Sequence, residues 1–270
     1  MKILVFTGGL GNQIFGYSFY NYLKDKYKDE TIYGIYNENK MSEHNGLEIN
    51  KYFDVQLPKS PLHIQLFTAI LYCFKKIGIG KKFISMDTRT FNPETIVNNA
   101  CKMDITLMPS SNNWINFKDI KLSNQNQQIL DQIKNNNSVF LHVRRGDYYS
   151  PQYIKKLGGT CPINYYEKAI HHITSKNKDI KFFVFSDDIA WVKENLMIPN
   201  PTYIDWNTGN DSFIDMYLMS QCKHAIIANS TFSYWGAQLG RAKDTIIYPT
   251  KWVNEPYTAP SIFPKHWITY

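Results

Sequence analysis

The second half of the chain alternates short apolar runs with amphipathic stretches. The apolar runs predict strands at 138–143, 181–186, 202–206, 224–229 and 244–249. The stretches between them predict helices at 162–173, 189–196, 213–222 and 232–242. Strands that alternate with capped helices indicate βαβ units and a parallel sheet. Ligands of such sheets bind beyond the carboxyl ends of the strands, so the residues just past each strand are the first candidates for a site.

The first half is less regular. An apolar run at 2–6 predicts a strand, which a glycine turn joins to a helix expected to begin at Asn12 and Gln13, and a second strand is expected at 31–36. A helix within 122–138 ends in an Asn-rich joint. We therefore expect an α/β protein of two Rossmann-like lobes, with a boundary near residue 130 that gives an N-terminal lobe of 1–130 and a C-terminal lobe of 131–270.

Composition narrows the classes of ligand. Formal net charge is +7, from 30 Lys and Arg against 23 Asp and Glu, which suits an anionic ligand or an anionic surface. The basic residues are scattered and match no nucleic-acid-binding module, so no nucleic-acid partner is expected. The four cysteines show no CxxC pair and no zinc-ligand spacing. Reduced thiols and a cytoplasmic location are therefore expected.

Two segments bear on membranes. The apolar residues before the glycine turn are too few for a signal-peptide core. The stretch 66–76 is apolar and ends in two lysines, but it is shorter than the roughly 20 residues that a bilayer span requires. It predicts either a packed helix with a basic end or a peripheral patch resting on the anionic inner membrane surface.

The glycine turn contains Gly8, Gly9 and Gly11. Glycine reaches positive φ freely and allows close approach of a ligand, and a helix N-terminus attracts anions. The spacing is neither GxGxxG nor a P-loop. The turn is therefore either an anion-binding loop or a plain strand-to-helix connection.

The string "HVRRGDYY" at 142–149 ends the strand at 138–143. If the strand continues to residue 145, alternation places His142 and Arg144 on one face and Arg145 on the other. A guanidinium offers a planar fork of donors that suits a diphosphate. We expect Arg145 to pair with Asp147 and hold the loop. The alternative is a purely structural Arg–Asp cluster.

Three further groups lie past later strands. Asp187 and Asp188 are adjacent rather than spaced as in a D-x-D metal motif, so no metal is expected, and Asp188 also suits a helix cap. Ser230, Thr231 and Ser233 place hydroxyls at a helix start, as a phosphate cradle or as caps. Because these loops share one sheet edge with Arg144, we expect them to face one crevice. A carboxylate at Asp215 would either read a guanine edge or be an exposed helix acid.

Together, "GGLGNQ", "HVRRGD", "FSDD" and "NSTFSYWGA", in this order, resemble the bacterial α-1,2-fucosyltransferases of glycosyltransferase family eleven, and more distantly the α-1,6- and protein O-fucosyltransferases. The resemblance implies inverting, metal-independent transfer of L-fucose from GDP-β-L-fucose, typically to the 2-hydroxyl of a terminal galactose in a glycan such as an O-antigen. It also implies a GT-B architecture in which the second lobe binds most of the donor, and no cofactor.

The same resemblance assigns roles to single residues. It implies that Arg144 holds the β-phosphate and that His142 lies beside the nucleoside. Asp187 is expected in the same donor site from its position past the strand at 181–186. It further implies that Asp215 reads guanine, and the residues expected to contact phosphate are Ser230, Thr231 and Phe232.

On the acceptor side, the resemblance places Asn12 beside the reacting centre, while the glycine amides would approach the pyrophosphate. The α-1,6 enzymes carry a glutamate where this chain has Gln152, so the resemblance assigns no general base. Two alternatives remain open: a related transferase with another linkage or nucleotide sugar, and a catalytically silent glycan-binding relative. The acceptor and the oligomeric state are not encoded in any legible motif.

Overall fold

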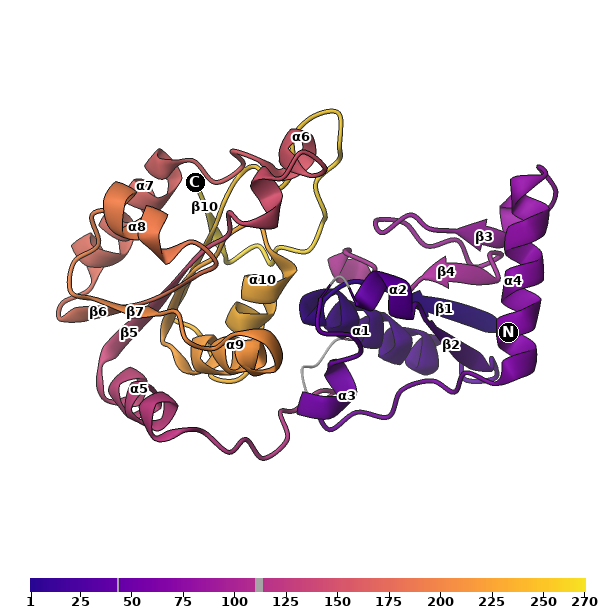
Figure 1. The fold of residues 1–270 in the computed structure, drawn as a ribbon, viewed down its shortest axis with the longest axis horizontal. Coiled ribbons are helices and arrows are strands. Elements are labelled where there is room, and N and C mark those ends of the chain that lie inside the picture. Colours follow the sequence, from indigo (N-terminus) through magenta and orange to yellow (C-terminus); the bar gives the residue numbers. More distant parts are fainter. Residues whose placement is uncertain (43, 110–113) are drawn as a thin grey trace. The chain divides into compact units, whose positions relative to one another are not determined.

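The fold is that of a computed structural model, which describes residues 1–42, 44–109 and 114–270. The chain forms two compact units (Figure 1). The first comprises Met1–Lys118 with Pro260–Ile262, and the second comprises Asp119–Ala259 with Phe263–Tyr270. The short return of the chain to the first unit is fixed by Ser261, whose backbone carbonyl accepts a hydrogen bond from Ile105 N (2.7 Å).

The first unit, over its described residues, contains a parallel sheet of order β2-β1-β4-β3. Its strands are β1 (Lys2–Phe6), β2 (Ile32–Tyr36), β3 (Ile84–Ser85) and β4 (Val97–Asn99). Helix α1 (Leu10–Lys26) packs on one face of β1 and α4 (Leu62–Lys76) on the other. Short helices α2 (Glu38–Met41) and α3 (Ile49–Tyr52) follow β2. The sequence predicted β1 and β2, but not β3 and β4.

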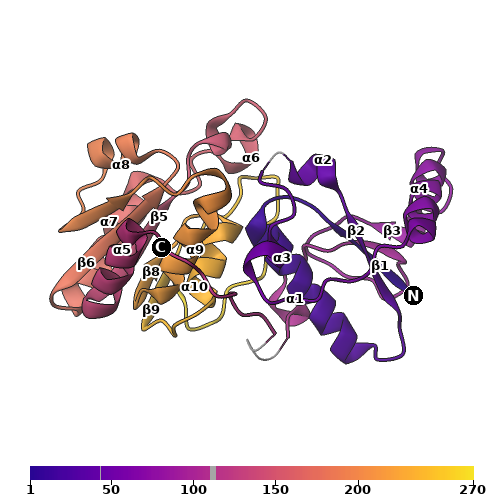
Figure 2. The ribbon, with the colours of Figure 1, turned by 60° about the horizontal axis from the view of Figure 1, so that its bottom comes forward.

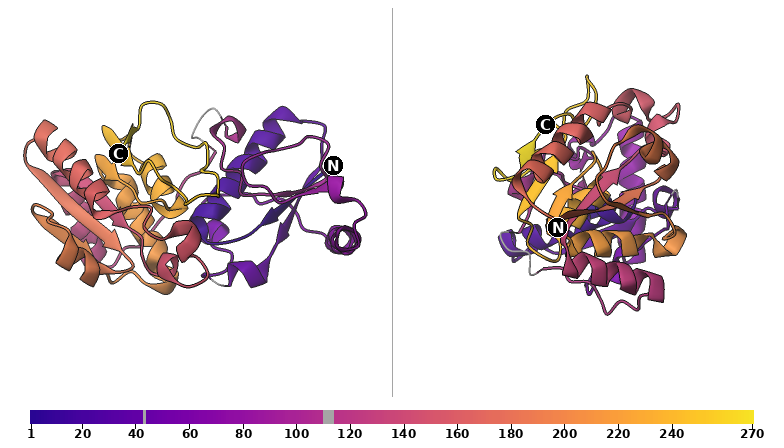
Figure 3. Two further views of the ribbon diagram at one scale, coloured as in Figure 1. Left: turned by 90° about the horizontal axis from the view of Figure 1, so that it is seen from above. Right: turned by 90° about the vertical axis from the view of Figure 1, so that its left-hand side faces the viewer.

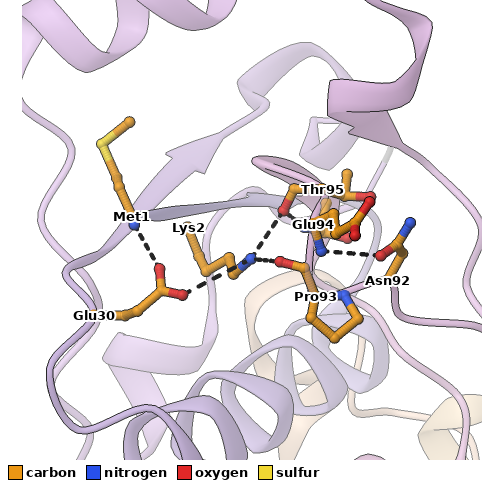
Figure 4. Close-up of polar contacts among 8 residues, drawn as sticks. Met1, Lys2, Glu30, Asn92, Pro93, Glu94 and Thr95 are labelled. Carbon is orange, nitrogen blue, oxygen red and sulfur yellow. Dashed lines mark hydrogen bonds and ion pairs between the residues drawn. The ribbon is translucent and has the colours of Figure 1, made fainter.

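A buried lysine ties the start of β1 to a distant turn. Lys2 is 4% exposed, and its ammonium donates to the backbone carbonyls of Pro93 and Thr95, as Figure 4 shows. Glu30 lies beside the same ammonium and beside the N-terminal amine of Met1. These contacts satisfy a charge that would otherwise be costly to bury.

The second unit, which is described in full, contains a parallel sheet of order β10-β9-β8-β5-β6-β7. Its strands are β5 (Asn137–Val143), β6 (Ile180–Ser186), β7 (Pro201–Ile204), β8 (His224–Ile226), β9 (Thr245–Tyr248) and β10 (Ile268–Thr269). Its helices are α5 (Asn124–Asn135), α6 (Ile154–Leu157), α7 (Ile163–Lys176), α8 (Ile189–Asn195), α9 (Ser212–Gln221) and α10 (Thr231–Gln238). The predicted strand and helix alternation is thereby confirmed.

Helices cover both faces of this second sheet (Figure 3). Val139, Leu141 and Val143 of β5 pack against α7 and α8 in one core. Helices α9 and α10 lie side by side, as Figure 2 shows. Helix α10 lies on the other face of β5, since the ring of Phe232 in α10 neighbours that of His142 in β5. The unit is therefore doubly wound, with α/β order throughout.

Three local differences from the predicted elements matter for the site. Helix α1 begins at Leu10 rather than at Asn12, because Gly9 is its extended N-cap and Gly8 takes the turn with φ +75°. Strand β8 ends at Ile226, so 227–229 form a loop before α10. The first unit ends at Lys118 rather than near residue 130, because α5 packs on α9 and β5 of the second unit.

No helix within the described ranges combines the length and the hydrophobicity needed to cross a bilayer.

Candidate active site

The second sheet has a topological switch point at β5. The chain leaves β5 for its neighbour β6 on one side, continues to β7, and then returns to β8 on the other side of β5. The connections from β5 and β8 therefore diverge at their carboxyl ends and open a crevice, the usual ligand position in an open parallel sheet. The loops that reach this point carry residues 144–149 and 227–230.

Arg144 follows β5 directly and is held by two carboxylates. Its Nη2 lies 2.8 Å from Asp147 Oδ1, and its Nη1 lies 3.1 Å from Asp187 Oδ2. The side chain remains 31% exposed. A guanidinium has five N–H donors, so two ion pairs orient it without exhausting its capacity for a ligand. Arg144 is thus a preoriented cation that is accessible at the switch point.

Arg145 makes a different set of contacts from the one predicted. We expected it to pair with Asp147, but its Nε lies 3.2 Å from Asp188 Oδ2. Its guanidinium also stacks over the rings of Trp191 (3.9 Å) and Tyr149 (4.3 Å). The expected pairing is wrong because side chains alternate at the end of β5: Arg145 turns toward α8, whereas Asp147 lies on the side of Arg144.

Gly146 lets a carboxylate approach the backbone of this loop. A Cβ at this position would lie 2.6 Å from Asp187 Oδ2. The other oxygen of Asp187 accepts a hydrogen bond from the backbone N–H of Arg145 (2.9 Å). Asp187 therefore fastens the loop after β5 to the end of β6. Its predicted contact with the nucleotide stays a prediction, but its geometry is that of a group that positions Arg144.

Tyr148 joins Arg144 to the loop after β8. The Arg144 guanidinium lies 5.6 Å from the centre of the Tyr148 ring. The Tyr148 hydroxyl donates to the carbonyl of Asn229 (3.0 Å) and also bonds the Ser230 side chain. Ser230 is the N-cap of α10, and its Oγ accepts from Phe232 N (3.3 Å). The predicted arginine and the predicted hydroxyl loop are therefore brought together.

His142 faces the same helix start. It is 6% exposed, and its ring centre lies 6.2 Å from that of Phe232. Burial, helped by the charge of Arg144, lowers the pKa of His142 to about 3, so the imidazole is neutral near pH 7. Its buried Nδ1 has no hydrogen-bond partner among the described residues. Such an atom is costly to leave unpaired, which favours a ligand group at this point. Thr231, the first residue of α10, is partly exposed.

Asp215 belongs to a different polar group. Its Oδ1 accepts from Asn207 Nδ2 (2.7 Å), and Asn207 and Asn126 exchange hydrogen bonds of 2.8 and 3.1 Å. Trp206 Nε1 donates to the same Asn126 (2.9 Å). Burial raises the pKa of Asp215 to about 7, against the opposing hydrogen bond from Asn207. Asp215 is therefore not a solvated helix acid, but a carboxyl poised between its two protonation states beside the end of β7.

In the first unit, the missing Cβ of Gly8 makes room for Asn12. An ideal Cβ on Gly8 would lie 2.4 Å from Asn12 Nδ2. Gln13 then fastens the turn: its Nε2 donates to Gly8 O (3.0 Å) and Gly46 O (2.8 Å). Its Oε1 accepts from the backbone N–H groups of residues 48 and 49 (2.8 and 3.1 Å). Gln13 of the string "GNQ" is therefore a structural clamp for the turn against which Asn12 packs.

A carboxylate of the chain itself lies at the start of α1. Glu48 is 2% exposed and accepts hydrogen bonds from the backbone N–H of Leu10 and from Asn45 Nδ2 (3.1 Å). Burial raises its pKa. Gly11 is buried in the first helical turn, and Gly9 lies against the ring of His44. Glu48 therefore already accepts a hydrogen bond from the N-terminus of α1. Binding of a ligand anion by the glycine amides stays a prediction.

Sequence similarity agrees with the motifs. The sequence model of glycosyl transferase family 11 matches residues 115–270. The chain belongs to this family. The resemblance drawn from the four motifs is confirmed, and the match includes the whole switch-point site of the second unit.

Relatives in this family carry related activities in their names. An α-1,2-colitosyltransferase of Escherichia coli is 37% identical over 156 residues, which are 56% of this chain and 54% of the relative. The E. coli O-antigen biosynthesis glycosyltransferase WbnK is 44% identical over 122 residues, 44% and 40% of the two chains. A galactoside α-(1,2)-fucosyltransferase of Rattus norvegicus is 31% identical over 103 residues, 37% and 27%. The matches span about half or less of these relatives.

A solved structure extends the comparison to the fold. The glycosyl transferase family 9 protein of Veillonella parvula matches with a TM-score of 0.51 at 12% identity, over 99% of this chain and 84% of that one. At this identity the likeness concerns the fold alone. It confirms the expected α/β class with two Rossmann-like units of the GT-B type.

Sequence reasoning missed several residues that shape the site. Tyr148 stood within a quoted motif without a role, and Asn207 lies in the loop that follows β7. Their positions just past strands were the available signal. No sequence signal indicated Gln13 and Glu48 as partners across the turn, because that contact joins residues 35 positions apart.

Proposed function

We propose that this protein transfers L-fucose from GDP-β-L-fucose to the 2-hydroxyl of a galactose-terminated glycan, with inversion and without a metal ion. The observation that carries the proposal is Arg144, held by Asp147 and Asp187 at the switch point and joined through Tyr148 to the start of α10. The motif that contains Arg144 lies inside the family match.

The charge at this point suits the departure of a nucleoside diphosphate. As GDP leaves, negative charge grows on the β-phosphate while the sugar becomes oxocarbenium-like. A preoriented guanidinium stabilises that charge without reorganising. Ser230 and Thr231 add a hydroxyl and the N–H groups of a helix start, which also favour a phosphate. Because the arginine supplies the charge that a divalent cation would, the proposal includes metal independence.

The guanine base is assigned to Asp215 and His142. An ionised Asp215 can accept from the N1–H and amino group of guanine, a pair of donors that adenine and uracil do not present together. The neutral His142 offers an unpaired Nδ1 to the nucleoside. Specificity for GDP would follow, since a nucleotide without that pair gives the partly buried carboxylate no donor beyond Asn207.

On the acceptor side, Asn12 is proposed to orient the incoming hydroxyl or the departing oxygen, and its side chain lies against Gly8 in the turn that Gln13 fastens. No general base is assigned, and Gln152 is exposed. We place the reaction in the cytoplasm, which is supported by the free thiols that the structure gives to all four cysteines.

A second donor is favoured by one of the relatives. The named activity of the 37% identical E. coli protein is transfer of colitose, which is fucose without its 3-hydroxyl. GDP-colitose would present the same diphosphate and guanine to the second unit. Only protein groups near the 3-hydroxyl could distinguish fucose from colitose. Transfer from the two GDP-sugars must therefore be compared directly.

The first test is transfer from each GDP-sugar to a panel of galactose-terminated acceptors in EDTA, followed by linkage analysis of the product. The second is calorimetry of the binding of GDP, UDP and ADP to the protein. The proposal requires selective GDP binding and an α-1,2 product from GDP-fucose. An α-1,2 product from GDP-colitose alone would move the assignment to the second donor. Equal binding of the three diphosphates, or no transfer from either sugar, would refute both.

A further inference from the structure

Helix α4 turns its apolar side away from the sheet that it packs on. Ile64 and Thr68 are its buried residues, and Leu71 and Tyr72 complete the contact with β1, β3 and β4. Large apolar side chains on the outer side are exposed, namely Leu62 (69%), Leu66 (57%), Phe67 (36%), Ile70 (53%), Phe74 (45%) and Ile77 (69%). Figure 1 shows α4 next to β3 and β4 of the first unit's sheet. We call these six residues the outer stripe.

The outer stripe is continuous along the helix. Leu62, Leu66, Ile70 and Phe74 follow one another at intervals of four residues, which is one row of neighbours on a helix surface. With about 100° of rotation per residue, the stripe spans about 140° of the helix circumference. An apolar face this wide is normally buried, and an exposed one marks an interaction site.

The segment that carries the stripe is positively charged. Between Val55 and Met86 the sequence has five lysines and no acidic residue; the lysines are Lys59, Lys75, Lys76, Lys81 and Lys82. All of them except Lys75, which is partly buried, are exposed. Asp87, the first acid after the segment, is already paired with Arg89 (2.9 Å). The segment therefore combines an exposed apolar stripe with an excess of positive charge.

We infer that the outer stripe of α4 and its flanking lysines dock this protein on an anionic phospholipid bilayer. An amphipathic helix with aromatic and aliphatic residues on one side and lysines at the margin lies in the plane of the interface. The lysines complement anionic headgroups, and the stripe enters the boundary with the acyl chains. Helix α4 has 15 residues, too few to span a bilayer, so it rests on the surface.

This inference goes beyond the proposed transfer reaction and does not depend on the donor. A membrane position would bring the enzyme to lipid-linked acceptors, while transfer to a soluble acceptor would need no membrane. The alternative binding partner of an apolar stripe is a second copy of the chain. The five lysines argue against it, because two such faces would repel each other.

The experiment is cosedimentation of the full chain with two kinds of vesicle, phosphatidylcholine alone and phosphatidylcholine mixed with phosphatidylglycerol. The variants are Leu66→Gln with Ile70→Gln, which removes apolar contact, and Lys81→Gln with Lys82→Gln, which removes charge. Met197→Gln is the matched control, because Met197 is 95% exposed and belongs to the second unit. Transfer to a soluble acceptor and thermal unfolding check that each variant is folded.

The wild type and Met197→Gln should bind the mixed vesicles and release from them as salt rises. Both double variants should bind at least about tenfold more weakly, with transfer to the soluble acceptor unchanged. Hydrogen exchange in 62–76 should slow only when mixed vesicles are present. Absence of wild-type binding, or full binding by Leu66→Gln with Ile70→Gln, would overturn the inference. So would a vesicle-free dimer that the same variant dissociates, since the stripe would then pair two copies.

Discussion

Asp187 Oδ2 lies 3.1 Å from Arg144 Nη1, and this ion pair joins the carboxyl ends of the neighbouring strands β6 and β5. The adjacent Asp188 makes the corresponding contact with Arg145, whose Nε lies 3.2 Å away. Two consecutive acids thus hold two consecutive arginines on opposite sides of the sheet. Only the first pair lies on the side of the Ser230 helix start.

The two acids therefore make a matched comparison. Asp187→Asn should lower kcat by about tenfold or more, because Arg144 loses one of the charges that orient it and about 1.5 kcal/mol of preorganisation with it. Asp188→Asn keeps the α8 N-cap, since asparagine also accepts the Trp191 N–H, and should leave kcat within about threefold of wild type. Steady-state kinetics with saturating donor measures both. Equal losses in the two variants would contradict a specific role for Asp187.

Gly146 should not tolerate a side chain. Alanine would place Cβ 2.6 Å from Asp187 Oδ2, so the carboxylate must move away from Arg144. We expect Gly146→Ala to reduce turnover about as much as Asp187→Asn. The double variant should be scarcely worse than either single one, because both changes act through the same ion pair. Additive losses in this cycle would mean that Gly146 acts independently of Asp187.

GDP affinity should depend on the ionisation of Asp215. With its pKa near 7, the carboxyl is mostly protonated at pH 6, and only the ionised form accepts both guanine donors. The dissociation constant for GDP should therefore rise by up to about tenfold per pH unit below 7 and level off above it. Calorimetry of GDP binding across this range measures the effect.

The control for that experiment is Asp215→Asn. This variant should bind GDP at least about tenfold more weakly at pH 8. Its dissociation constant for GDP should also lose most of the steep dependence on pH. The phosphate of GDP titrates in both proteins, so only the difference between the two profiles reports on Asp215. Parallel profiles would remove Asp215 from guanine recognition.

Gln13 should matter for stability of the first unit. It is fully buried and bonds Gly8 O, Gly46 O and two backbone N–H groups. Gln13→Ala leaves these groups without partners and should lower the free energy of unfolding by about 2 kcal/mol or more. Chemical denaturation measures it. Asn21→Ala, at a partly buried position on the same helix, is the control and should cost about 1 kcal/mol or less.

The second unit was the more predictable half. Its strands β5 and β6 are long apolar runs, and Pro162 and Asp188 occupy the predicted helix starts. Strands β3 and β4 escaped prediction because two or three residues show no measurable period, and their pairing with β1 supplies the order that the local sequence lacks.

The residues that lie at the switch point could be selected from the sequence, but their contacts could not. Position past a strand was enough to select Arg144, Asp187 and Ser230. The pairing of Arg145 with Asp188 instead of Asp147 depends on where the loop after β6 places its two carboxylates. Likewise, Glu48 reaches α1 from a distant loop. Such pairings are tertiary, and no local pattern encodes them.

The most direct test of the account is the turnover of Arg144→Ala with GDP-fucose and a soluble galactose-terminated acceptor. If Arg144 stabilises the leaving diphosphate, kcat should fall by about 100-fold or more, equivalent to about 3 kcal/mol of barrier, while thermal unfolding stays close to wild type. Arg144→Lys should recover only part of the loss, because an ammonium lacks the planar fork. Near wild-type turnover in folded Arg144→Ala would contradict the central claim.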